Sequence, residues 1–198
     1  MQIIKIKIKK NSRLITNNHL SKNMKNIFCL WITGISGAGK TTLAKKTKEL
    51  LTAKGHNVIL LDGDDVRSSI NADLSFTMEG RDENIRRIAQ LAKLLSKQNI
   101  VTIVSVISPM ERQRHLAHEI FGDSFHLIYL KASLKRCVKN DVKGLYKEAK
   151  QKKITNFTGM TSPYEEPQNA NLTIDTDKNN ADLTAKLLNQ YIDKIGRG

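Results

Sequence analysis

The residues best suited to chemistry form a glycine-rich segment in the first quarter of the chain. The segment fits the pattern G-x-x-x-x-G-K-[ST] and consists of Gly34, Ile35, Ser36, Gly37, Ala38, Gly39, Lys40 and Thr41, followed directly by Thr42. Glycines at this spacing let backbone N–H groups point inward around phosphate groups. Lys40 can bridge the terminal phosphates, and the hydroxyl of Thr41 can ligate Mg²⁺. The segment therefore predicts a binding site for ATP together with Mg²⁺.

A cluster of carboxylates follows the next expected strand and reads Asp62-Gly63-Asp64-Asp65-Val66-Arg67. In a parallel sheet, the end of such a strand faces the phosphate-binding segment across a crevice. Asp62 or Asp64 is then placed to hold Mg²⁺ or to accept the proton of an attacking hydroxyl group, whereas Asp65 is expected to face water. Acidic turns after strands are commonly solvated caps, so the catalytic interpretation depends on the neighbouring phosphate site.

Arginines are the next feature, namely Arg67, Arg81, Arg86 and Arg87. Their planar guanidinium groups suit the oxygens of phosphate and sulfate. A helix that starts at Arg81 would point Asn84 in the same direction. For Arg86 and Arg87, a role as ordinary surface arginines is as well supported as a binding role. Phe76 lies in a polar stretch, where it can either stack on a base or join the core.

These side chains need a scaffold, and the hydrophobic pattern predicts one. Short apolar runs with strand composition occupy residues 27–33, 58–61, 100–107, 127–130 and 172–174. Residues 41–54 and the apolar positions between 85 and 95 have helical spacing. Alternation of this kind predicts an α/β fold of the P-loop NTPase type, with about five parallel strands and helices on both faces. Residues 139–167 are basic, polar and without clear periodicity, which is typical of a mobile flap.

Length and composition indicate a single soluble domain. The chain has 198 residues, of which 39% are hydrophobic and 26% charged. No apolar run approaches the roughly 18 residues that a membrane helix needs, so we expect no membrane partner. Cys29 and Cys137 lack the spacing of metal ligands and are expected to be buried in a reducing, cytoplasmic compartment.

Half of the formal charge of +14 lies in residues 1–25, which contain seven lysines and arginines and no acid. We expect this basic N-terminal extension to be flexible and residues 26–198 to form a single P-loop kinase domain. The extension has no aromatic residue for base stacking and no recognisable nucleic-acid-binding module. Nucleic acid is therefore not the favoured partner, and the remaining charge suits phosphate ligands.

Together these residues resemble the adenylylsulfate kinase family, whose members phosphorylate the ribose 3′-hydroxyl of adenosine 5′-phosphosulfate (APS). The resemblance extends from about residue 26 to residue 190. Its motifs are the phosphate-binding segment, the Asp62 cluster, Asp73-Leu74-Ser75-Phe76, Glu83-Asn84-Ile85-Arg86-Arg87, Ile107-Ser108-Pro109, Asp141-Val142-Lys143-Gly144-Leu145-Tyr146, Phe157-Thr158-Gly159 and Pro163-Tyr164-Glu165. So many motifs in the same order are more specific than the phosphate-binding segment alone.

The resemblance implies an enzyme that converts APS and MgATP into 3′-phosphoadenosine 5′-phosphosulfate (PAPS) and ADP. By analogy with many members of the family, it also implies a homodimer. It places Lys40, Asp64 and Ser108 among the catalytic residues and Thr41 and Asp62 at the metal. The residues that it places around the acceptor are Asp62, Asp64, Arg67, Phe76, Arg81, Asn84, Ile107, Ser108, Lys143 and Phe157.

Specific roles also come from the resemblance. Asp64 would act at the attacking 3′-hydroxyl, Arg67, Arg81 and Asn84 would hold the phosphosulfate end, and two aromatic rings, Phe76 and Phe157, would sandwich the adenine. Ile107 and Ser108 would line this pocket, and Lys143 would reach the bound nucleotides. The family's phosphoserine intermediate would fall on Ser108, although direct in-line transfer needs no protein nucleophile.

Several positions depart from the family pattern. They are Gly80, where an aspartate is usual, Asn140, where an arginine is usual, Met110 and Glu111 after Ser108-Pro109, and Thr161-Ser162 before Pro163. These departures keep open a second function, a kinase of the same scaffold that acts on another nucleotide-linked alcohol. A third alternative, a P-loop protein that binds nucleic acid, depends only on the basic extension.

Overall fold

A computed structural model describes residues 27–141, 143–154 and 157–196. Five parallel strands form one sheet in the order β2-β3-β1-β4-β5. The strands are β1 (Cys29–Thr33), β2 (Val58–Asp62), β3 (Val101–Ser105), β4 (Phe125–Lys131) and β5 (Leu172–Asp175). The predicted α/β fold with about five parallel strands is confirmed. The extension predicted for residues 1–25 lies outside the described residues.

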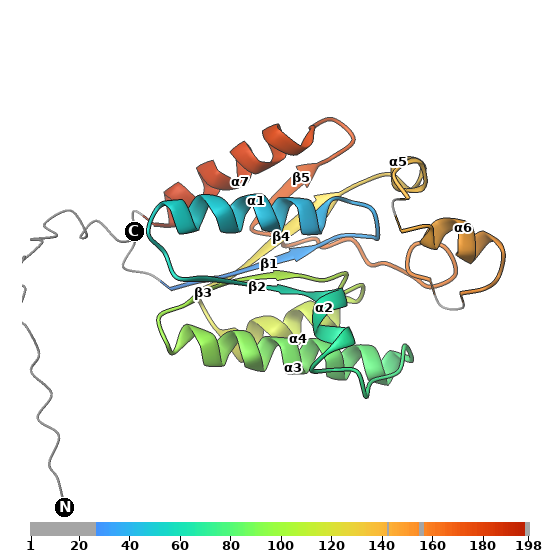
Figure 1. Ribbon diagram of the computed structural model, residues 1–198, viewed down its shortest axis with the longest axis horizontal. Helices are drawn as coiled ribbons and strands as arrows, with labels where there is room; N and C mark the ends of the chain where they lie inside the picture. The colour runs from blue at the N-terminus through green and yellow to red at the C-terminus, as the bar shows by residue number, and fades with distance from the viewer. Residues whose placement is uncertain (1–26, 142, 155–156, 197–198) are drawn as a thin grey trace, which may run out of the picture.

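Helices cover both faces of this sheet, as Figure 1 shows. Helices α1 and α7 lie on one face, and α3 and α4 lie together on the other. The helices are α1 (Lys40–Ala53), α2 (Gly63–Ser68), α3 (Met78–Ser96), α4 (Glu111–Phe121), α5 (Leu134–Lys139), α6 (Leu145–Lys150) and α7 (Ala181–Ile195). In the part of the chain that the structure describes, no helix is long and apolar enough to span a bilayer.

The central strand β1 explains why two cores form. Its side chains alternate across the sheet, and all five residues are buried. Leu30 and Ile32 pack with residues of α1 and α7, whereas Cys29 and Trp31 pack with α3 and α4. Burial on both faces accounts for the continuous apolar runs in the sequence. Cys29 and Cys137 are both free and buried, as predicted.

All strands point the same way, so their carboxyl ends meet at one edge of the sheet. Within the sheet, β3 and β2 lie on one side of β1, and β4 and β5 lie on its other side. This reversal of strand order opens a crevice above β1, the place where open α/β sheets bind ligands. Helices α2, α5 and α6 lie around this edge (Figure 1).

Two local expectations differ from the structure. The strand expected at residues 100–107 ends at Ser105, because residues 106–109 leave the sheet and Ser108 adopts a left-handed φ of 38°. Within residues 139–167, expected to be irregular, α6 is helical and Thr158 forms a bridge with Ser162. Helix α6 has only six residues, and only Tyr146 and Ala149 of it are buried. Two apolar positions are too few to show helical periodicity in the sequence.

Candidate active site

The phosphate-binding segment, residues 34–42, connects β1 to the first turn of α1. Gly39 takes a left-handed φ of 95° directly before the helix, a conformation that glycine adopts without steric cost. The first turn of α1 contains no acidic side chain. The free N–H groups of this turn and the loop are thus available to an anionic group at the crevice.

Lys40 lies over this loop, where its Nζ donates a hydrogen bond of 2.9 Å to the carbonyl oxygen of Ile35. Burial of the ammonium group lowers the pKa of Lys40 to about 8, although the nearby carboxylates of Asp62 and Asp64 oppose the shift. A bound phosphate would restore a higher pKa, because an adjacent negative charge favours the protonated form. Lys40 is therefore placed to pair with an anion in the crevice.

Two carboxylates mark the other side of the loop. Asp62 ends β2, and its Oδ2 accepts a hydrogen bond of 2.8 Å from the hydroxyl of Thr41. Its Oδ1 accepts the backbone N–H of Asp64 at 3.1 Å, so Asp62 also caps α2. Asp64 is exposed and forms an ion pair with Lys143, and Asp65 is exposed as predicted. The two residues predicted for the metal, Thr41 and Asp62, thus lie in contact.

Arg67 lies three residues after Asp64 on α2, and residues at this spacing are neighbours on the same face of a helix. The guanidinium of Arg67 donates to the carbonyl oxygens of Leu74 and Ser75, at 3.3 and 3.1 Å. It also lies 4.4 Å from the centre of the Phe76 ring. This cation–π contact leaves Phe76 65% exposed, a position open to a stacking partner.

Arg81 connects two segments that are far apart in sequence. Its Nε donates to the carbonyl oxygen of Phe76 at 3.1 Å, and its NH1 donates to the hydroxyl of Thr158 at 2.8 Å. Burial lowers the pKa of Arg81, and burial together with the charge of Arg81 lowers the pKa of Arg67. Two partly buried cations so close together favour an anionic ligand between or beside them.

Asn84 lies one turn after Arg81 on α3 and is buried. Its Oδ1 accepts a hydrogen bond of 2.9 Å from Nδ2 of Asn71, which belongs to the segment between α2 and α3. The side chains of Arg81 and Asn84 therefore both hold that segment. Arg86 and Arg87 do not join this group, since Glu83 binds both of them and Asp73 binds Arg87.

Ser108 is only 2% exposed. Its hydroxyl accepts a hydrogen bond of 3.1 Å from Nε1 of Trp31 and donates one of 3.0 Å to the hydroxyl of Thr33. Ile107 is half-buried, and its carbonyl oxygen accepts from the hydroxyl of Thr33 at 2.5 Å. Hydrogen bonds to Trp31 and Thr33 therefore hold Ile107 and Ser108 against β1.

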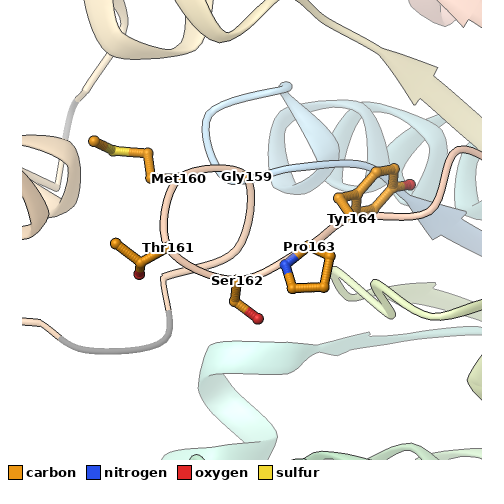
Figure 2. Close-up of a pocket in the computed structure, with 6 residues that line it drawn as sticks. All are labelled: Gly159, Met160, Thr161, Ser162, Pro163 and Tyr164. Atoms are coloured by element: carbon orange, nitrogen blue, oxygen red, sulfur yellow. The ribbon is translucent and has the colours of Figure 1, made fainter.

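Residues 143–154 and 157–164 approach the phosphate-binding segment from outside the sheet. The Tyr146 hydroxyl donates to the carbonyl oxygen of Ser36 at 2.8 Å, and Phe157 packs edge-to-face on Tyr146 with ring centres 4.9 Å apart. Figure 2 shows the following turn, Gly159–Tyr164, which lines a pocket. An added Cβ at Gly159 would lie 3.4 Å from Ile35, so this turn is in contact with the loop.

The comparisons with known proteins agree with this arrangement. The family model for adenylylsulphate kinase matches residues 26–175. The chain belongs to the adenylylsulfate kinase family. It is 46% identical to the adenylyl-sulfate kinase of Halothermothrix orenii, over 88% of this chain and 94% of that protein. It is 43% identical to the adenylyl-sulfate kinase of Bacillus licheniformis, over 86% of this chain and 87% of that protein.

A solved member of the adenylylsulfate kinase family has the same fold. The structure of the APS kinase CysC of Mycobacterium tuberculosis, in complex with AMPPNP and APS, matches with a TM-score of 0.79 and 36% identity. The match covers 84% of this chain and 96% of that one. Membership of the family and the P-loop kinase fold, both predicted from the sequence, are confirmed.

Two residues of this adenylylsulfate kinase family member, Thr33 and Arg114, were not singled out from the sequence. Thr33 connects Ile107 to the Tyr164 hydroxyl, 3.0 Å away. Arg114 is 2% exposed and donates to the carbonyl oxygens of Ser108 and Glu165, at 2.7 and 2.8 Å. A buried arginine on an amphipathic helix is indistinguishable in sequence from an exposed one.

Proposed function

We propose that this chain transfers the γ-phosphate of ATP to the 3′-hydroxyl of APS and releases PAPS and ADP. The observation that carries the proposal is the position of α2 between two sites. At one end of α2, Asp64 lies close enough to Lys40 for its charge to affect the pKa of that lysine. At the other end, Arg67 lies beside Phe76 and Arg81. One short helix therefore faces a phosphate loop and an anion pocket.

In the proposed reaction, the acceptor 3′-oxygen forms a bond to the γ-phosphorus while the bond to the β–γ bridging oxygen breaks. Asp64 orients the acceptor hydroxyl and takes up its proton. Lys40 neutralises charge on the transferred group, and the backbone N–H groups of residues 34–42 hold the β-phosphate. Lys143 forms an ion pair with Asp64, so its ammonium group lies beside the carboxylate that the acceptor hydroxyl would approach.

Arg67 and Arg81 hold the phosphosulfate end of APS in this proposal, and Asn84 supports them from α3. Phe76 is exposed for stacking on the adenine, whereas Phe157, which is buried against Tyr146, would close the opposite side. The Thr158 hydroxyl connects these two aromatic segments through Arg81. The flap was expected at residues 139–167, and its described parts at 143–154 and 157–164 would then exclude water from the transferred phosphate.

Mg²⁺ fits beside the phosphate loop. Thr41 and Asp62 present two side-chain oxygens in contact with each other, and Mg²⁺ commonly binds through one or two such oxygens plus substrate phosphates. No cluster of three or more histidine, cysteine or acidic residues occurs in the described ranges, which suits a metal that arrives with ATP. When bound, the ion would neutralise charge on the β- and γ-phosphates.

Ser108 is assigned a positioning role instead of a covalent one. Its hydroxyl is buried and already hydrogen bonded to Trp31 and Thr33, so it does not face a γ-phosphate in the crevice. Its left-handed φ of 38° turns the chain so that Ile107 lines the pocket. Mutation of Ser108 to Ala should therefore weaken APS binding without eliminating transfer.

The test is product analysis with purified protein, MgATP and one acceptor at a time. With APS, we expect ADP and PAPS to appear at equal rates in nucleotide chromatography. ADP without PAPS, or transfer only to a different nucleotide-linked alcohol, would contradict the proposal. The second outcome would support the alternative kinase function, which the departures from the family pattern keep open. A homodimer remains a prediction, which light scattering at assay concentration would test.

A further inference from the structure

Ser105 is the last residue of β3, at the carboxyl edge of the sheet, and it is only 3% exposed. Its hydroxyl forms no hydrogen bond with any residue that the structure describes. A buried hydroxyl without a partner costs free energy, because it gives up its hydrogen bonds to water on folding. Alanine would fit the same strand without this cost. A buried hydroxyl of this kind at the edge of a binding crevice points to a polar ligand as its partner.

Strand pairing fixes the direction in which this hydroxyl points. Ser105 pairs with Ile32 of β1 on one side and with Asp62 of β2 on the other. Side chains of directly paired residues point to the same face of a sheet. Ile32 packs in the core beneath α1, and Asp62 accepts a hydrogen bond from Thr41 in the first turn of α1. The Ser105 hydroxyl therefore faces α1, on the strand next to the Asp62 carboxylate.

The neighbouring oxygens are those proposed to hold Mg²⁺. The Thr41 hydroxyl and Oδ2 of Asp62 lie 2.8 Å apart, and Asp62 is 7% exposed, so its carboxylate is nearly as buried as Ser105. Mg²⁺ usually keeps several of its water molecules when one or two protein oxygens bind it. These waters donate hydrogen bonds, and the Ser105 hydroxyl offers an unused acceptor at this place.

From this placement we propose that Ser105 is a positioning residue for the Mg²⁺ that accompanies ATP. Its hydroxyl accepts a hydrogen bond from a water in the shell of the ion and so orients that shell beside Asp62. Groups that act in this way commonly change metal affinity or activity by about 10–100-fold. The inference rests on the proposed Mg²⁺ site at Thr41 and Asp62. It adds a third residue, which binds neither the ion directly nor the acceptor.

The test measures binding instead of turnover. Calorimetry gives the dissociation constant for the ATP analogue AMPPNP in EDTA and in saturating Mg²⁺, and the ratio of the two constants is the magnesium enhancement. For Ser105→Ala we expect the magnesium enhancement to fall about tenfold. The dissociation constant for AMPPNP in EDTA and the dissociation constant for APS should both be unchanged, because Ser105 is assigned only to the hydrated ion.

Thermal stability separates this role from a structural one. Ser105→Ala removes a hydroxyl without a partner among the described residues, so the Tm in EDTA without nucleotide should equal that of the wild type or exceed it. A variant that does not fold, or whose Tm falls by about 3 °C or more, would show that the hydroxyl stabilises the chain itself. Either result would overturn the proposal.

Thr102→Val is the matched control. Thr102 is buried near the other end of β3, and valine removes its hydroxyl while nearly keeping its shape. The magnesium enhancement of this variant should equal that of the wild type. An equal loss in both variants, or no loss in Ser105→Ala, would overturn the role of Ser105 and leave the Mg²⁺ site in place. If the wild-type chain shows no magnesium enhancement, the proposed Mg²⁺ site itself is wrong, and the role of Ser105 with it.

Discussion

The phosphate loop and the acceptor pocket are built in different ways. The phosphate loop is one continuous segment, residues 34–42, between a fully buried strand and a helix. The acceptor pocket collects Arg67 from α2, Phe76 from the following segment, Arg81 from α3 and the segment of Thr158. Hydrogen bonds between side chains and carbonyl oxygens hold these four pieces together.

Because of this difference, the phosphate loop and the acceptor pocket should tolerate different substitutions. A loop that binds through its own backbone N–H groups needs a short local pattern, and few substitutions preserve it. A pocket assembled from several segments can change through any residue that spaces them, even one that touches no ligand.

Lys40→Ala should have the largest effect of all. Loss of the ammonium group removes the lysine that contacts the loop through Ile35, and we expect transfer to fall by roughly three orders of magnitude. The measurement is PAPS formation at saturating ATP and APS. Lys48→Ala is the control, because Lys48 is exposed on the same helix. Activity of Lys40→Ala within tenfold of the wild type would remove Lys40 from the mechanism.

Asp64→Asn should lower kcat by about a hundredfold, because the amide cannot accept the proton of the 3′-hydroxyl. We expect the dissociation constant for AMPPNP, measured by calorimetry, to change much less. Asp65→Asn, at the exposed neighbouring position, is the control, and its kcat should be nearly that of the wild type. If Asp64→Asn keeps its kcat and loses affinity for AMPPNP, Asp64 contributes to ATP binding. The proposed role of Asp64 at the acceptor hydroxyl would then be wrong.

Arg81→Ala should raise KM for APS by about tenfold or more, since each hydrogen bond from a charged group contributes about 1.5–3 kcal/mol. KM for ATP should be unchanged. The control is Arg86→Ala, because Arg86 is exposed and pairs with Glu83. Steady-state kinetics with each substrate varied in turn gives both constants. A rise confined to KM for ATP would place Arg81 on the other nucleotide.

The smallest expected effect is a pH dependence confined to the phosphate loop. The pKa of Lys40 in the free protein is lowered to about 8 by burial, so the lysine is protonated below that pH and neutral above it. Affinity for AMPPNP should therefore be constant below pH 8 and fall about tenfold from pH 8.5 to 9.5. Affinity for APS should not follow this curve. A flat profile for AMPPNP in the wild type would contradict the assignment.

The same difference explains what the sequence could predict. The five strands and α1 came from apolar runs and helical spacing, and the structure confirms them with small shifts at their ends. The phosphate loop is local, so its position between β1 and α1 followed from its pattern. Cys29 and Cys137 are buried, as expected for two cysteines that lack the spacing of metal ligands.

The acceptor pocket was harder to predict, because its geometry depends on contacts across the chain. Arg67 and Arg81 were expected to bind anions, but the carbonyl oxygens that hold them could not be read from the sequence. Nor could the buried state of Arg114, whose partners lie at Ser108 and Glu165. Ser108 shows the same limit, since its burial depends on Trp31 and Thr33 in another strand.

The most direct test of the division between the two regions is a calorimetric cross-titration. Lys40→Ala and Arg81→Ala would each be titrated with AMPPNP and, separately, with APS. The account predicts that Lys40→Ala loses affinity for AMPPNP and keeps its affinity for APS, and that Arg81→Ala does the reverse. If both variants lose affinity for the same nucleotide, the phosphate loop and the arginine pocket bind one ligand, and the proposed transfer between them is wrong.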